Sequence, residues 1–493
     1  MEICNEKIFG NQIITMENKS ILSNFIWRFA ERCGAQLVEF IVSVVLARVL
    51  APEAYGIVAL LTVFTTILQV FVDSGLGNAL IQKKDTDDTD FSTVFYANVI
   101  FCIILYTALF LCAPLIAAFY DNQSLIWLIR VLGLTIVVSG VKNIQQAYVS
   151  KHMLFKRFFF SALGGTIVAA FVGITMAVHG YGAWALVAQQ VVNVTIDTAI
   201  LWITVEWRPK KIFSLQRLKC LYSYGWKLLI SSLIDIGYNN LRQLIIGKMY
   251  SSADLAYYNR GRQFPSMIVG NINNSIDSVL FPTMSNAQDN RDDIKKMTRR
   301  SIKTSIYIMA PAMMGMIFTA DLIVKLVLTN KWIGCVPYLQ IFCITYMFWP
   351  IHTANLNAIK AMGRSDLFLK LEIAKKAVGI ILLLSTMRLG AMAMAYSLLV
   401  SSVISQIINS WPNKKLLNYG YGEQLKDIYP SIVLSLGMGI VIWGISLFKL
   451  PIMVTLIIQI LSGVIIYILG SIIFKFDSFV YLKRIVKTFI NKK

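Results

Sequence analysis

The chain alternates between apolar stretches of about 20 residues and short polar connections. A helix of about 20 apolar residues is about 30 Å long, which matches the hydrocarbon thickness of a bilayer. The pattern therefore predicts an all-α polytopic membrane protein with about fourteen transmembrane helices. The predicted spans are Leu22–Ala47, Tyr55–Leu80, Phe91–Phe119, Leu125–Ile144, Phe158–Val178, Ala183–Val205, Tyr222–Gly247, Leu255–Met284, Thr304–Leu328, Val336–Ile359, Leu367–Met387, Gly390–Trp411, Ile428–Phe448 and Ile452–Phe474.

Two stretches about 200 residues apart follow the same plan of a polar-faced helix, a short outer turn and a second helix. They begin near Trp27 and near Trp226. The likeness predicts two pseudo-symmetric six-helix lobes plus two C-terminal helices. The predicted segments are a cytoplasmic N-terminal segment (1–21), an N-lobe (22–205), a cytoplasmic inter-lobe linker (206–221), a C-lobe (222–411), a cytoplasmic loop (412–427), the last two spans (428–474) and a basic cytoplasmic tail (475–493).

Composition and charge support this interpretation. In a chain of 493 residues, 57% are hydrophobic, which is more than a water-facing surface can carry. Of its basic residues, roughly thirty fall in alternate connections and termini, Lys142 among them, and about six fall in the others. Since basic residues favour the cytoplasmic side, both termini are predicted to be cytoplasmic. The net charge of +20 is thereby explained by membrane lipids as partners, without a nucleic acid.

Charged residues inside predicted spans indicate where the chemistry lies, because each costs about 2.5–3.5 kcal/mol at mid-bilayer. On the first and seventh spans they share one helical face, and the eighth span is also polar. A positively lined cavity suits an anionic, phosphate-bearing substrate. The predicted substrate-binding residues are Arg28, Arg32, Lys227, Arg242, Arg260 and Arg262, and the predicted polar or coupling residues are Glu31, Glu39, Asp235, Asn239, Asn274 and Asp277.

A structural alternative stays open for these charges, which would then pair to hold helices together. Glu31 would pair with Arg28 or Arg32, and Asp235 with Arg242 or a neighbour. Gln189, Asn193 and Asp197 form a further polar stripe on the sixth span.

Motifs for enzymatic chemistry are weak. The run Asp85–Asp90 resembles the DxD of glycosyltransferases, but Thr89 or Asp90 is expected to cap the helix that starts at Phe91. The three histidines lack HExxH spacing, the seven cysteines lack CxxC pairing, and no Walker motif occurs. The sequence therefore predicts a protein that is not an enzyme and has neither a metal nor a cofactor.

The sequence resembles the polysaccharide-transporter branch of the multidrug/oligosaccharidyl-lipid/polysaccharide exporter superfamily. The resemblance covers nearly the whole chain, with Ala256 where the family often has Gly. Its most specific segments are Leu46–Gly56, Phe71–Gly77, Ala79–Gln82, Ile245–Lys248, Leu255–Arg260 and Phe281–Pro282.

The resemblance implies two lobes around a central cavity and alternating access in a bacterial cytoplasmic membrane. It also implies a flippase for undecaprenyl-pyrophosphate-linked oligosaccharide in surface polysaccharide synthesis, with a polysaccharide polymerase and glycosyltransferases as partners. The membrane potential would favour outward movement of negative charge, and coupling to a proton or sodium gradient is compatible with this scheme. A lipid II flippase, a multidrug exporter of the same superfamily and a membrane polymerase or glycosyltransferase stay open as alternatives.

Overall fold

A computed structural model describes residues 34, 36–73, 76–82, 86–448 and 450–490, and within these the chain forms helices and no strand. Ten of the described helices or helix pairs are long and apolar enough to cross a membrane. The prediction of an all-α polytopic membrane protein is thereby confirmed, whereas the number of about fourteen spans is not.

The chain divides into two compact units, residues 1–253 and 254–493. In the first unit α5 contacts α2, α3, α4, α6 and α7, and α8 packs on α2, α3 and α4. Residues 36–49 are also helical. The helices of this unit are α2 (Pro52–Asp73), α3 (Leu76–Gln82), α4 (Asp88–Phe119), α5 (Leu125–Lys151), α6 (Phe155–Val178), α7 (Ala183–Thr204) and α8 (Leu215–Met249).

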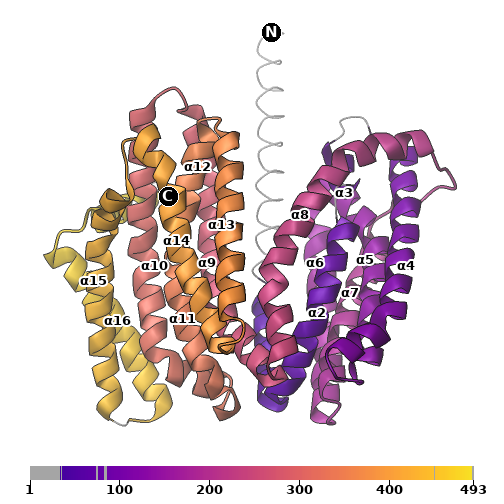
Figure 1. Cartoon of the computed structure of the whole chain (residues 1–493), viewed down its shortest axis with the longest axis horizontal. Helices are drawn as coiled ribbons and strands as arrows, with labels where there is room; N and C mark the ends of the chain where they lie inside the picture. Colours follow the sequence, from indigo (N-terminus) through magenta and orange to yellow (C-terminus); the bar gives the residue numbers. More distant parts are fainter. Residues whose placement is uncertain (1–33, 35, 74–75, 83–85, 449, 491–493) are drawn as a thin grey trace, which may run out of the picture. The chain divides into compact units, whose positions relative to one another are not determined.

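In the second unit α10 contacts α11, α12, α15, α16 and α17. Figure 1 shows α15 and α16 side by side at the yellow end of the chain. The helices are α9 (Ser252–Asn286), α10 (Arg291–Val327), η1 (Asn330–Cys335), α11 (Val336–Met347), α12 (Trp349–Ala361), α13 (Ser365–Thr386), α14 (Ala391–Leu416), α15 (Tyr421–Ile445), η2 (Ser446–Phe448), α16 (Ile452–Ile473) and α17 (Asp477–Ile490).

Three helices at predicted spans are not among the ten apolar ones. Helices α8, α9 and α13 carry charged residues along their length, such as Asp235, Arg260 and Lys375. Charges lower the mean hydropathy of a helix even where neighbouring helices shield them from lipid. Helix α8 belongs to the first compact unit by its contacts, and the predicted division into lobes of six spans each stays a prediction.

One predicted span is broken in the middle. The segment expected as a single helix over Val336–Ile359 forms α11 and α12, which meet at Phe348. Pro350 follows this break directly and has no N–H, so a continuous helix would lack one of its hydrogen bonds there.

Gly56 on α2 allows a close approach of two backbone segments. A Cβ at this position would lie 1.7 Å from the carbonyl oxygen of Ser252. Since that atom is backbone, the clash is relieved only if a helix shifts. We expect Gly56→Ala to lower the midpoint of thermal unfolding by several degrees, which corresponds to roughly 1–3 kcal/mol. Gly237→Ala on α8 is the matched control, because its Cβ would meet no atom within 4 Å; equal melting of the two variants would refute the prediction.

The predicted basic tail is a helix. Helix α17 packs Phe479 and Leu482 against a cluster that includes Tyr307 and Met438, and Lys303 Nζ lies 2.8 Å from Asp477 Oδ2 at its start. The hydrogen bond and charge of Lys303 hold the pKa of Asp477 below its ordinary value.

A lowered carboxyl pKa stabilises the docked helix above about pH 4 and ceases to do so as the pH falls through the lowered pKa. After correction for the intrinsic exchange rate, the backbone amides of α17 should therefore be equally protected from hydrogen exchange at pH 5 and pH 8. Asp477→Asn should weaken this protection at both pH values. A loss of protection between pH 8 and pH 5 in the unmodified protein would contradict the role assigned to Asp477.

Candidate functional site

The predicted site residues fall in both compact units, and each unit is considered by itself. Arg28, Glu31 and Arg32 lie outside the described residues, as does the side chain of Lys227. Glu39 lies in the described helical segment 36–49 and is exposed.

In the first unit the predicted residues lie along α8. Asn239 Nδ2 donates to Asp235 Oδ2 over 3.2 Å, and one turn on, Arg242 is only 4% exposed. The Nε and Nη2 atoms of Arg242 have no hydrogen-bond partner among the described residues. A buried guanidinium with unmade hydrogen bonds is costly and favours an anion that accepts them. Of the described predicted residues, Arg242 is thus the one best suited to bind a negatively charged group.

In the second unit the two predicted arginines of α9 are anchored by neighbours. Arg260 is 7% exposed, donates to Gln263 Oε1 over 2.6 Å and lies over the ring of Trp332. Arg262 Nε donates to the hydroxyl of Tyr346 over 2.7 Å. Both arginines pack against η1 or α11 through these contacts. These contacts fix the positions of two positively charged side chains on α9.

Farther along α9, polar residues bond to α12. Asp277 Oδ1 accepts from Asn357 Nδ2 over 2.7 Å, and Asn273 Oδ1 accepts from Thr353 Oγ1 over 2.7 Å. Asn274 is exposed. The structural alternative, in which polar groups hold helices together, thus fits Asp277 well, while Asn274 remains accessible.

The sequence interpretation missed a polar group on α12, α13 and α14. Lys375 Nζ lies 2.5 Å from Glu372 Oε1, and the His352 ring lies 2.9 Å from Asn409 Nδ2. Glu372 and Lys375 lie within the predicted span Leu367–Met387. Their charges could have indicated this polar group, because an ionisable residue inside the membrane suggests a functional site.

Lys142 was wrongly assigned to an inner connection. It lies within α5, and its Nζ is 3.0 Å from Asp197 Oδ2 on α7, with the two side chains 17% and 15% exposed. The polar stripe of α7 that includes Asp197 thus has a cationic partner on the neighbouring helix. The predicted span Leu125–Ile144 already includes Lys142, and the helix runs on beyond it to Lys151.

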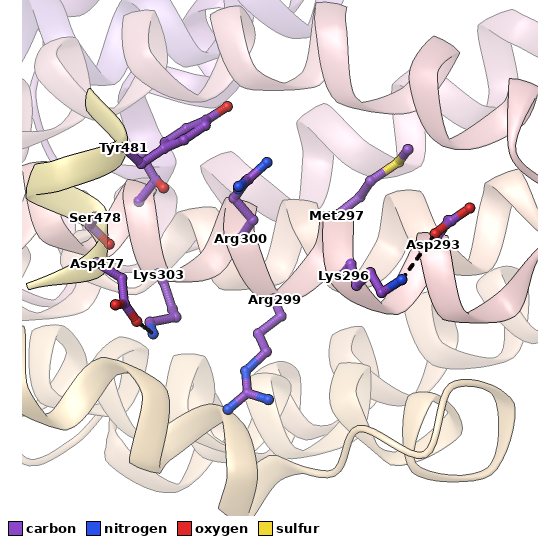
Figure 2. A pocket seen from close by; sticks show the side chains of 10 residues that line it. Asp293, Lys296, Met297, Arg299, Arg300, Lys303, Asp477, Ser478 and Tyr481 are labelled. Carbon is purple, nitrogen blue, oxygen red and sulfur yellow. Dashed lines mark hydrogen bonds and ion pairs between the residues drawn. The ribbon is translucent and has the colours of Figure 1, made fainter. Parts of the chain in front are cut away.

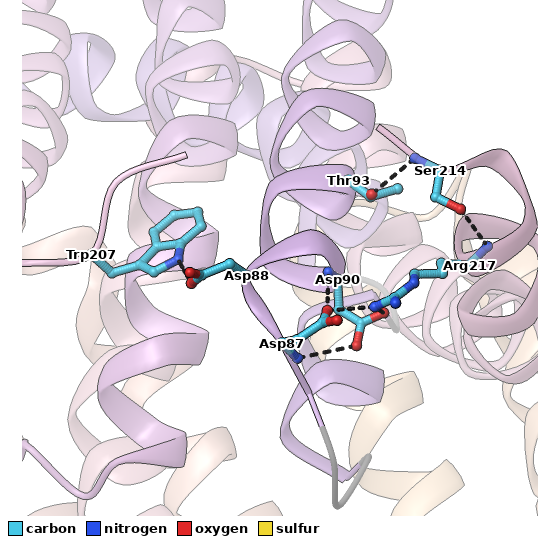
Figure 3. Close-up of polar contacts among 7 residues, drawn as sticks. All are labelled: Asp87, Asp88, Asp90, Thr93, Trp207, Ser214 and Arg217. Atoms are coloured by element: carbon cyan, nitrogen blue, oxygen red, sulfur yellow. Dashed lines mark hydrogen bonds and ion pairs between the residues drawn. The ribbon is translucent and has the colours of Figure 1, made fainter. Parts of the chain in front are cut away.

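The acidic run before α4 is bound by basic residues. Asp87, rather than Thr89 or Asp90, caps α4 in a capping box with Asp90. Arg217 forms ion pairs with both Asp87 and Asp90, and Trp207 Nε1 donates to Asp88 Oδ1 over 3.1 Å (Figure 3). We call Asp87, Asp88, Asp90, Trp207 and Arg217 the acidic clasp.

The segment between α7 and α8 is fastened to α4 by further bonds. Ser214 N donates to Thr93 Oγ1 over 3.1 Å, and Lys210 N donates to Ser92 Oγ over 3.0 Å. The carboxylates of the acidic clasp are thus engaged in bonds that hold the fold together, and this does not favour a DxD metal site. Among the described residues, no three His, Cys, Asp or Glu side chains are grouped so that they could hold a metal ion.

Long apolar helices with ionic groups buried among them define a polytopic membrane protein. A family profile described as "Polysaccharide biosynthesis protein" matches residues 45–337, more than half of the chain. The chain therefore belongs to this family, and the predicted polysaccharide-transporter relationship is confirmed.

Curated relatives match over most of their length. The teichuronic acid biosynthesis protein TuaB of Bacillus subtilis is 24% identical over 82% of this chain and 85% of its own. The lipopolysaccharide biosynthesis protein WzxC of Escherichia coli is 23% identical over 81% and 84%, and the succinoglycan biosynthesis transport protein ExoT of Rhizobium meliloti is 22% identical over 67% of each chain.

Among solved structures, the lipid II flippase MurJ in an inward closed conformation matches with a TM-score of 0.75. The match covers 91% of this chain and 98% of MurJ at 15% identity. An inward-facing multidrug resistance transporter of the MATE family matches with a TM-score of 0.61, over 78% of this chain and 94% of that one. At such identities the likeness shows a shared fold.

Proposed function

We propose that this protein is a flippase that moves undecaprenyl-pyrophosphate-linked oligosaccharide repeat units from the inner to the outer leaflet. The observation that carries the proposal is the match, over four-fifths of the chain, to relatives named for teichuronic acid and lipopolysaccharide biosynthesis. A relative named as a succinoglycan transport protein supports transport rather than catalysis. The repeat units moved to the outer leaflet would serve O-antigen, capsule or exopolysaccharide assembly, with a polymerase and glycosyltransferases as partners.

The described arginines suit the charged part of this cargo. Arg242 has two buried N–H groups without partners among the described residues, and a pyrophosphate oxygen accepts such bonds. Arg260 and Arg262 are held in place by Gln263 and Tyr346, so their charge is preorganised. In this scheme the sugar crosses beside polar groups such as Asn274 while the prenyl tail stays in lipid.

Orientation follows from the basic residues. The start of α10 and helix α17, which are rich in Lys and Arg, would then face the cytoplasmic side of a bacterial inner membrane. Both termini are then cytoplasmic.

The membrane potential can drive the cycle. Outward movement of negative charge gains about 2.3 kcal/mol per charge per 100 mV when the interior is negative. Return of an emptied, positively charged site is favoured by the same potential. A proton or sodium gradient is therefore an additional source of energy rather than a requirement.

The test is flipping of a lipid-linked oligosaccharide in proteoliposomes that contain the purified protein. An imposed potential without an ion gradient should speed flipping, and failure to respond to the potential would end this version of the mechanism. Flipping of lipid II but not of the lipid-linked oligosaccharide would instead support the function named for MurJ, whose fold this chain shares.

A further inference from the structure

Two cavities at one end of the second unit share part of their walls. The first, of about 690 Å³, lies between the start of α10 and helix α17 (Figure 2). The second, of about 750 Å³, lies mainly along α15 and also reaches α16. Lys303, Asp477 and Ser478 line both cavities. One ligand can therefore occupy both spaces.

The first cavity is cationic. Its lining holds four basic side chains of α10 against two carboxylates, those of Asp293 and Asp477. Lys296 and Lys303 each lie near one of these carboxylates, at 3.4 and 2.8 Å. Arg299 lies 2.7 Å from Asp427, which lines the second cavity.

Arg300 differs from its neighbours in this cavity. Its guanidinium lies 4.2 Å from the ring centroid of Tyr481, and it forms no ion pair with a carboxylate of the described residues. Stacking on an aromatic ring fixes the plane of a guanidinium and leaves its N–H edge able to bind an oxyanion.

The second cavity is lined mainly by apolar side chains, together with three lysines and the carboxylates of Asp427 and Asp477. Val433, Leu434 and Val441 of α15 line it, and a Cβ at Gly437 would meet no atom within 4 Å. Lys426 and Lys475 join Lys303 around the same space. An apolar groove that opens into a cationic pocket has the polarity of a lipid with an anionic headgroup.

We propose that these cavities form one binding site for an anionic phospholipid of the surrounding membrane. The phosphate would lie against Arg300 and Lys303, and an acyl chain would follow the groove past Gly437. Arginine suits the headgroup because its fork donates two hydrogen bonds to one phosphate. Helix α17, which is amphipathic and carries Lys483 and Arg484 on its exposed side, would close the site from the aqueous side. The proposal does not depend on the identity of the transported cargo.

The test uses the purified full-length protein in detergent, with native mass spectrometry and thermal unfolding as readouts. Phosphatidylglycerol should be retained and should raise the melting midpoint, whereas phosphatidylcholine should do neither. Soluble glycerol phosphate at the same concentration should also have no effect, because it lacks the acyl chain. Equal retention of both lipids, or an equal shift with glycerol phosphate, would overturn the proposal.

Two substitutions probe the two halves of the site. Arg300→Gln should reduce retained phosphatidylglycerol by about fivefold or more, while Arg291→Gln, on the same helix but outside both cavities, should not. Gly437→Leu should reduce retention by filling the groove without a change in charge, and it should melt like the unmodified protein when no lipid is added. Retention unchanged in both Arg300→Gln and Gly437→Leu would refute the site.

Discussion

Replacing Asp197 by Leu should destabilise the first unit by about 3–5 kcal/mol, because Lys142 is then left as an uncompensated charge among helices. The pair joins α5 to α7 with both side chains largely buried. The double variant Lys142→Met, Asp197→Leu removes both charges and should regain most of the lost stability. Thermal unfolding of the purified protein, together with the yield of folded protein, measures both effects.

An exposed pair gives the control for this experiment. Arg157 Nη2 lies 3.8 Å from Glu206 Oε1, and the side chain of Glu206 is 93% exposed. Glu206→Gln should change stability by no more than about 1 kcal/mol. If Asp197→Leu were as mild as Glu206→Gln, the Lys142 pair would not hold the helices together.

Replacing Arg242 by Met should reduce flipping of the lipid-linked oligosaccharide by about 10- to 100-fold, since a hydrogen bond to a charged group contributes about 1.5–3 kcal/mol. The same change should leave thermal stability equal or higher, because it removes a buried guanidinium whose Nε and Nη2 lack partners among the described residues. Loss of transport without loss of stability separates a ligand-binding residue from a structural one.

Arg130→Gln is the matched control in the same unit. The Arg130 guanidinium lies over the rings of Phe110 and Trp127, so this arginine is occupied by its own surroundings. Transport per folded molecule should stay near that of the unmodified protein. A fall in stability for Arg242→Met, with transport per folded molecule unchanged, would assign Arg242 a structural role instead.

The apolar helices could be predicted because their signal is local. The predicted spans at Ala183–Val205 and Ile452–Phe474 differ from α7 and α16 by a single residue at the C-terminal end. Helix starts were harder, since Asp87 competes as a cap with two neighbours of similar chemistry. The extra turns of α5 end in Lys151, a residue that a hydropathy argument places in water.

The candidate site was only partly predictable for a related reason. The sequence shows that Arg242, Arg260 and Arg262 lie within predicted spans, but it does not show what each side chain contacts. That depends on residues far along the chain, such as Trp332 and Tyr346, which meet α9 only after folding. The pair of Lys142 with Asp197 could not be predicted, because 55 residues separate the two along the chain.

The acidic clasp has a consequence for biosynthesis. The carboxylate of Asp87 leaves the ribosome 130 residues before its partner Arg217. At about 5–20 residues per second, the delay is roughly 7–26 seconds. During that time the four helices α4 to α7 are synthesised, while the carboxylates at the start of α4 still lack Arg217 as a partner. The ion pairs of Arg217 with Asp87 and Asp90 form only after Arg217 has been synthesised. The first unit therefore reaches its final form only when α8 has begun to emerge.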